Sequence, residues 1–117
     1  LIVNSIKSLY NMLSEVGNNN LKVCIDLGAC AGAGETIDEY FNCFKKEIIH
    51  CHFVDGNPTG HLAWGDGTRN MLEDISAFQK NDYQGYLSFE FASSRYFKEP
   101  FKADKKSIEM FKSLKRR

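Results

Sequence analysis

Three side chains that can bind a metal ion lie near the carboxyl ends of three separate apolar stretches: Asp26, His52 and Glu90. One imidazole and two carboxylates suit a hard-to-borderline divalent cation such as Mn²⁺, Mg²⁺, Co²⁺ or Zn²⁺. Each residue taken alone also fits a hydrogen-bonded position in a protein core, which is the commoner situation for a buried Asp or His. Three such residues at equivalent positions favour a site for one divalent metal ion.

The elements that would position these residues follow from the spacing of apolar side chains. Short apolar runs predict three buried strands, at 21–27, 48–54 and 86–91. Helical spacing predicts four helices, at about 5–16, from the capping box of Thr36 and Glu39 onward, at 69–79 and at 103–114. The Gly- and Ala-rich residues 28–34 predict a loop.

One helix followed by three strand–helix units predicts an α/β fold with a parallel sheet, because strands joined through helices run parallel. The carboxyl ends of parallel strands meet at one edge, so Asp26, His52 and Glu90 are expected to converge there. Three strands cannot close a barrel and would leave two open edges. We therefore expect the chain to be part of a larger fold.

Side-chain alternation is expected to separate an apolar face from a polar face in each strand. In the last strand, Leu87 and Phe89 would lie opposite Glu90. In the middle strand, Ile49 and Cys51 would share a face, opposite His52. A polar inner face with a helix-covered outer face is what a barrel wall with a site at its rim requires.

The composition limits the class of protein. With 117 residues, of which 43% are hydrophobic, the chain is long enough for one packed domain and too short for two. Its 15 basic and 15 acidic residues cancel, which argues against nucleic-acid binding through overall charge. No apolar run is long enough for a membrane span. The four cysteines lack CxxC spacing and mostly lie in apolar patterns, which favours reduced thiols in a cytoplasmic protein.

Four stretches of the sequence resemble the C-terminal half of the xylose-isomerase-like TIM barrels. VCIDLG at 23–28 is similar to the sixth strand of that family, HCHFVDG at 50–56 with GHLAWGDG at 60–67 to the seventh strand and its loop, and GYLSFE at 85–90 to the eighth strand. The resemblance implies that residues 1–117 form a single partial domain, the C-terminal half of a (β/α)8 TIM barrel. It would comprise one helix and the strand–helix units six to eight.

The resemblance also implies an activity and a set of ligands. Epimerases of the family hold one metal ion with two Glu, one Asp and one His, to which Glu90, Asp26 and His52 correspond; the second Glu is expected upstream of Leu1. The two Glu act as an acid/base pair on the proton beside a substrate carbonyl, so Glu90 is expected to be catalytic. The metal would stabilise the resulting cis-enediolate as a Lewis acid.

Three positions depart from branches of the family. Endonuclease IV binds further zinc through a His three residues after the strand-six Asp and through an Asp-x-His after strand seven. Ala29 and Thr59 stand at two of these positions and only His61 matches, which argues against a nuclease site with several zinc ions. Ala29 also replaces a His that touches the substrate in several sugar epimerases, and Pro58 stands where epimerases of free ketoses carry Arg. The substrate therefore stays open.

The loop after the middle strand supplies three candidates for substrate binding. His61 is a candidate to contact a sugar hydroxyl, because loop residues often carry function. Trp64 is a candidate to cover the sugar or to pack on a neighbouring subunit. Asp55 is a candidate to orient His52 or the substrate.

The sequence thus predicts a metal-dependent ketose epimerase or isomerase that acts on a small sugar or sugar derivative. Two alternatives stay open: a dehydratase on the same scaffold, and a non-catalytic fragment or half-barrel module. We expect the partner of this chain to be a second copy in a homo-oligomer or a missing N-terminal half.

Overall fold

The computed structural model describes residues 2–115, which alternate helices and strands in the predicted order with one additional helix. The helices are α1 (Ile6–Val16), α2 (Leu27–Gly32), α3 (Ile37–Phe44), α4 (Met71–Lys80) and α5 (Pro100–Leu114). The strands are β1 (Val23–Asp26), β2 (Ile48–His52) and β3 (Tyr86–Ser88), and single 3₁₀ turns span Lys45–Glu47 and Ser94–Tyr96. Within residues 2–115, no helix is long and apolar enough to cross a membrane.

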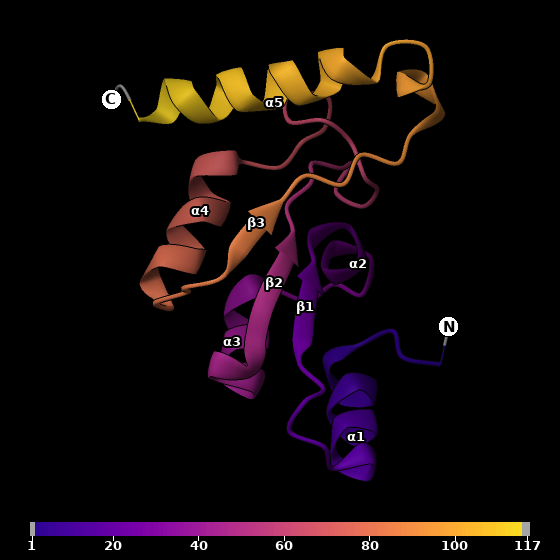
Figure 1. The fold of residues 1–117 in the computed structure, drawn as a ribbon, viewed down its shortest axis with the longest axis vertical. Coiled ribbons are helices and arrows are strands. Elements are labelled where there is room, and N and C mark those ends of the chain that lie inside the picture. The colour runs from indigo at the N-terminus through magenta and orange to yellow at the C-terminus, as the bar shows by residue number, and fades with distance from the viewer. Residues whose placement is uncertain (1, 116–117) are drawn as a thin grey trace.

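The three strands form one parallel sheet in the order β1-β2-β3, as the strand–helix alternation predicts (Figure 1). Asp26 pairs with His52, and His52 pairs with Ser88. One row of residues therefore crosses the sheet at the carboxyl ends of its strands. Figure 1 shows α5 lying across the end of the molecule toward which all three strands point.

One face of the sheet carries the hydrophobic core. Ile25 and Cys51 are fully buried and belong to one cluster with the aromatic residues of α3 and α4. Phe41 of α3 packs edge-on against Phe78 of α4, with ring centroids 5.7 Å apart. The opposite face is open, and Tyr86 on it is 80% exposed. This asymmetry agrees with a barrel wall whose helices lie outside.

The sequence-based prediction of a loop at 28–34 is wrong for residues 28–32, because α2 begins immediately after β1 and ends at Gly32. The side chain of Asp26 accepts a hydrogen bond from the Ala29 amide and so caps this short helix. Residues 2–115 consequently contain five α-helices rather than the predicted four. The capping box of Thr36 and Glu39 at the start of α3 is confirmed.

Two element boundaries and the side on which one residue lies differ from the prediction. β3 ends at Ser88, so Glu90 lies two residues beyond the strand rather than inside it. α5 begins at Pro100, since proline fits the first helical turn. In β2, Ile48 is buried while Ile49 is 52% exposed, because the register between β1 and β2 shifts at this end of the strands.

Candidate metal centre

Asp26 connects the sheet to the site, because it is both the last residue of β1 and the cap of α2. Its Oδ1 accepts the hydrogen bond from the Ala29 amide at 2.9 Å. Its Oδ2 points to two imidazoles and lies 3.2 Å from His52 Nδ1 and 2.8 Å from His61 Nε2. One carboxylate oxygen is thus used by the backbone, and the other faces the site.

His52 and Glu90 meet on the same side of the sheet. His52 ends β2 in register with Asp26, and its Nδ1 lies 2.9 Å from Glu90 Oε2. Glu90 follows Ser88, the partner of His52 in the sheet, by two residues. The structure brings the three residues with metal-binding side chains together at the carboxyl ends of the strands.

His61 joins this cluster from the long loop between β2 and α4. Its Nε2 lies 2.8 Å from Asp26 Oδ2 and 3.5 Å from Glu90 Oε2. The sequence offered His61 as a substrate-binding residue and matched it to one zinc-binding His of endonuclease IV, but it did not predict that His61 would face the two carboxylates. Its position depends on an irregular loop, which carries no periodic pattern from which a direction could be predicted.

The electrostatics of the cluster favour an anionic Asp26. Its partial burial would raise the pKa of the carboxyl, but the hydrogen bond from the Ala29 amide and the contacts with His61 and His52 outweigh this effect. The pKa of Asp26 therefore lies below its ordinary value. A carboxylate that stays deprotonated is ready to bind a cation.

The donor set fits a divalent metal ion. Asp26, His61 and Glu90 each offer one ligand atom, and these three atoms lie within 4.8 Å of one another. His52 Nδ1 adds a further nitrogen within 3.2 Å of both carboxylates. Imidazole and carboxylate ligands together suit Zn²⁺, Co²⁺, Mn²⁺ and similar ions.

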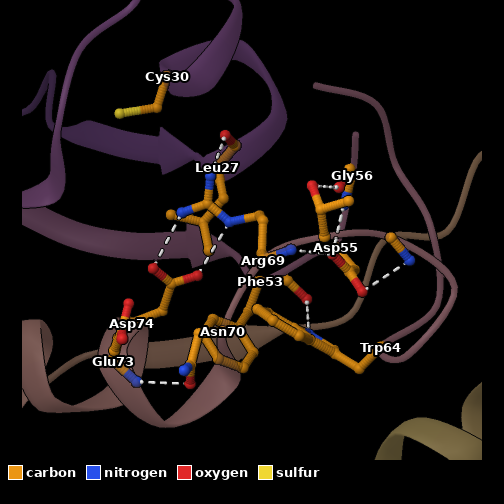
Figure 2. A network of polar contacts seen from close by, with 12 residues as sticks. Leu27, Cys30, Phe53, Asp55, Gly56, Trp64, Arg69, Asn70, Glu73 and Asp74 are labelled. Atoms are coloured by element: carbon orange, nitrogen blue, oxygen red, sulfur yellow. Dashed lines mark hydrogen bonds and ion pairs between the residues drawn. The ribbon is translucent and has the colours of Figure 1, made fainter. Parts of the chain in front are cut away.

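Asp55 lies outside this cluster, and backbone amides of the loop between β2 and α4 surround its carboxylate (Figure 2). It is 1% exposed, and its carboxylate accepts four backbone hydrogen bonds of 2.7–3.0 Å, from the amides of Gly56, Gly65, Gly67 and Arg69. Each of its oxygens accepts two of them, so neither is left to orient His52 or a substrate. Asp55 instead folds the loop between β2 and α4 around itself.

Trp64 is also buried rather than poised over the cluster. It is 0% exposed, its Nε1 donates to the Phe53 carbonyl at 3.1 Å, and its ring centroid lies 4.5 Å from that of Phe53 (Figure 2). Its backbone amide donates to Ser107 of α5 at 3.0 Å. Because a fully buried ring cannot touch a substrate, Trp64 supports the loop by joining it to β2 and to α5.

The far end of the same loop is held by Arg69. Its guanidinium donates two hydrogen bonds to Asp74 of α4, at 2.9 and 3.0 Å, and a longer one to the Leu27 carbonyl at the start of α2 (Figure 2). Burial raises the pKa of the Asp74 carboxyl above its ordinary value, although the pairing with Arg69 opposes this. The arginine thereby ties α2, the loop and α4 together.

The chain is similar to known proteins over nearly its whole length. Residues 1–114 match the family model described as "Xylose isomerase-like TIM barrel". The uncharacterized protein MJ1311 of Methanocaldococcus jannaschii is 28% identical over 88 residues, which cover 72% of this chain and 30% of that protein. The chain therefore spans about a third of this curated relative.

Two solved structures share the fold. The 3-keto-D-glucoside 4-epimerase YcjR from E. coli superposes with a TM-score of 0.74 at 14% identity, over 96% of this chain and 41% of its own. The D-allulose 3-epimerase from Methylomonas sp., solved with D-allulose, gives a TM-score of 0.63 at 15% identity, over 99% of this chain and 43% of its own. At these identities the likeness concerns the fold, which is a partial TIM barrel.

Proposed function

Because this chain belongs to the xylose isomerase-like TIM barrel family, we propose that it forms part of a metal-dependent sugar epimerase or isomerase. The reaction would remove a proton from the carbon beside a carbonyl and return it, through a cis-enediolate. The observation that carries the proposal is the meeting of Asp26, His52 and Glu90 within 3.2 Å contacts beyond the carboxyl ends of a parallel sheet. Catalytic groups of TIM barrels gather at that end.

The two carboxylates have different roles in this proposal. Asp26 is fixed by the Ala29 amide and held anionic by its lowered pKa, which suits a permanent ligand. Glu90 has the more accessible side chain, 49% exposed against 23% for Asp26, so it is the one that a substrate reaches. We assign to Glu90 the removal of the proton. A divalent cation held by Asp26, His52 and Glu90 would supply the Lewis acid that polarises the carbonyl.

The proposed substrate class is a small ketose or keto-sugar derivative. The two solved neighbours are named for the epimerisation of D-allulose at carbon 3 and of a 3-keto-glucoside at carbon 4. In both cases the carbon that inverts lies beside a keto group. Abstraction of the proton from such a carbon is the chemistry that a carboxylate beside a Lewis acid can perform.

Proton exchange in D₂O tests the proposal. The purified protein, loaded with Mn²⁺ or Co²⁺, is incubated with D-allulose and with a 3-keto-glucoside, and the sugars are followed by NMR. We expect deuterium at the carbon beside the carbonyl, loss of exchange in Glu90→Gln, and normal exchange in Glu109→Gln, which alters an exposed residue of α5. Loss of water from the sugar would instead identify a dehydratase, and absence of both reactions would contradict the proposal.

A second candidate is a half-barrel module that acts only with a partner. It is supported by the open face of the sheet, where the row of Cys24, His50 and Tyr86 lies on the side away from the core. The partner would be a second copy of this chain or the other half of the barrel. Mass in solution and metal content separate the candidates, because a metal-free monomer would contradict the enzyme proposal for this chain.

A further inference from the structure

His61 places a second imidazole in the cluster, beyond the three ligands that the resemblance to the epimerases of the family implies. Its Nε2 faces two carboxylates, at 2.8 Å from Asp26 Oδ2 and 3.5 Å from Glu90 Oε2. We propose that His61 binds the metal ion directly through Nε2, so that this chain alone supplies four ligands: Asp26, His52, His61 and Glu90. The inference rests on the metal site of the proposed function and names a ligand that this function does not require.

The backbone around His61 is fixed on several sides. The neighbouring Leu62 exchanges both backbone hydrogen bonds with Asp55, at 2.9 and 3.0 Å. The carbonyl of His61 accepts a hydrogen bond at 3.0 Å from the amide of Ala92, which lies just after Glu90. These contacts couple His61 to the segments that carry the site, and a ligand held in place before binding loses little freedom when the metal binds.

Two glycines allow this close approach. Gly60 has a φ of +107°, which side chains other than glycine rarely adopt, and it turns the chain directly before His61. Gly28 of α2 lies against the Gly60 carbonyl, and a Cβ at Gly28 would overlap this oxygen. The loop can therefore rest on the start of α2, beside Asp26, and direct His61 into the cluster.

The contacts of the imidazole favour a ligand over a simple hydrogen-bond partner of Asp26. Nε2 of His61 lies 2.8 Å from Asp26 Oδ2 and 3.5 Å from Glu90 Oε2, so it faces both carboxylates and not Asp26 alone. Nδ1 of His52 has the same relation to the same two carboxylates, at 3.2 and 2.9 Å. Each of the two nitrogens thus faces both carboxylates, and imidazole and carboxylate are the ligand types that four-coordinate zinc sites use.

A second imidazole changes which metal the site prefers. Mg²⁺ favours oxygen ligands, whereas Zn²⁺ and Co²⁺ accept imidazole readily. With two imidazoles and two carboxylates, the site is expected to bind Zn²⁺ and Co²⁺ more tightly than Mg²⁺. Removal of His61 should narrow this difference in affinity.

NMR of the three histidines tests the proposal at the level of single atoms. The protein is labelled with ¹⁵N in the imidazole rings and titrated with Zn²⁺ alone. We expect large shifts of His52 Nδ1 and His61 Nε2, and no large shift at His50, which lies one row back in β2. A shift confined to His52, or no shift at either residue, would overturn the proposal.

Matched variants extend this test to affinity. Loss of a group that only supports a ligand costs about 10–100-fold in metal affinity, so loss of a ligand in His61→Asn is expected to exceed about 100-fold. His50→Asn serves as the control and should keep the affinity of the original protein. If His61→Asn also keeps it while His52→Asn does not, the inference fails and the proposed function stands. If both imidazoles bind zinc but no sugar is turned over, the proposed function fails and the inference stands.

Discussion

Two polar clusters border the loop between β2 and α4, and they differ in how their carboxylates are used. The candidate metal site consists of Asp26, His52, His61 and Glu90, and the loop anchor consists of Asp55, Trp64, Arg69 and Asp74. Asp55 is buried and its two oxygens accept four backbone amides. Asp26 gives only one oxygen to an amide and turns the other toward two imidazoles.

This difference distinguishes a carboxylate that stabilises the fold, Asp55, from a carboxylate that can bind a ligand, Asp26. A carboxylate whose four acceptor positions are filled by the backbone has nothing left for a ligand, and its removal leaves amides unpaired. A partly exposed carboxylate beside imidazoles remains open to a cation. The two clusters cooperate, because the loop that Asp55 organises is the loop that presents His61.

The largest expected effect is that of Asp55→Ala on stability. The substitution leaves four amides of the loop without their acceptor, and we expect the free energy of unfolding to fall by about 3–5 kcal/mol. Asp26→Ala removes one helix cap and should cost only about 0.5–2 kcal/mol. Urea unfolding of the metal-free variants measures both values.

Asp104→Ala provides the control for these two variants, since Asp104 is exposed on α5. Its effect on the free energy of unfolding should stay within about 0.5 kcal/mol. Equal losses in the free energy of unfolding for Asp55→Ala and Asp26→Ala would contradict the proposed difference between the two carboxylates.

The next effect in size is expected for Trp64→Phe. The smaller ring leaves a small cavity beside Phe53 and removes the indole N–H donor, so the Phe53 carbonyl loses its partner. We expect a loss of about 1–3 kcal/mol in the free energy of unfolding, with zinc affinity changed only slightly. A large loss of zinc affinity in a variant of near-normal stability would mean that Trp64 belongs to the candidate metal site after all.

Gly28→Ala tests the contact between α2 and the loop that carries His61. A methyl group at this position would overlap the Gly60 carbonyl and push the loop away from α2. Overpacking of this kind costs about 1–3 kcal/mol, and here we expect the lower end because the loop can move. Zinc affinity should fall about tenfold, as for loss of a positioning group. Gly32→Ala, whose Cβ would meet only an ordinary contact with Thr59, should change neither quantity.

The smallest effect is a difference in acid sensitivity. The pKa of Asp26 is lowered in the folded protein, so its contribution to stability is present above the ordinary value of 3.8 and is lost as the pH falls through the lowered value. The pKa of Asp74 is raised, so its contribution has the opposite sign and decreases as the pH rises above 3.8.

Unfolding of the metal-free protein from neutral pH to about pH 3 measures this difference. The gap in free energy of unfolding between the original protein and Asp26→Asn should narrow as the pH falls below 3.8, whereas that between the original protein and Asp74→Asn should not narrow there. If the free energy of unfolding depended on pH in the same way in all three proteins, the result would contradict the lowered pKa of Asp26 and the raised pKa of Asp74.

Much of the framework was predictable from the sequence, because it depends on periodic patterns and on strand order. Alternating strands and helices predict the parallel sheet, and the sheet brings Asp26 and His52 to one edge. The short helix α2 was not predicted, because a segment rich in Gly and Ala is also typical of a loop. The end of β3 was placed too late, because apolar residues continue past the last pairing.

The roles of the loop residues were harder to predict. Asp55 and Trp64 were expected to reach a substrate, but tertiary packing buries both, and burial depends on contacts with β2 and α5 that no local pattern records. His61 enters the cluster through a turn at Gly60 and a close approach at Gly28. Such contacts between distant segments become visible only in three dimensions.

Metal content of the protein tests the metal centre most directly. The original protein, Asp26→Asn and Asp104→Asn are stripped with a chelator, incubated with Zn²⁺, desalted and analysed by mass spectrometry. Asn is as good a helix cap as Asp, so Asp26→Asn should stay folded. We expect about one zinc ion per chain in the original protein and in Asp104→Asn, and less than about a tenth of that in Asp26→Asn. Equal zinc in all three proteins, or none in any, would contradict a metal site at the ends of these strands.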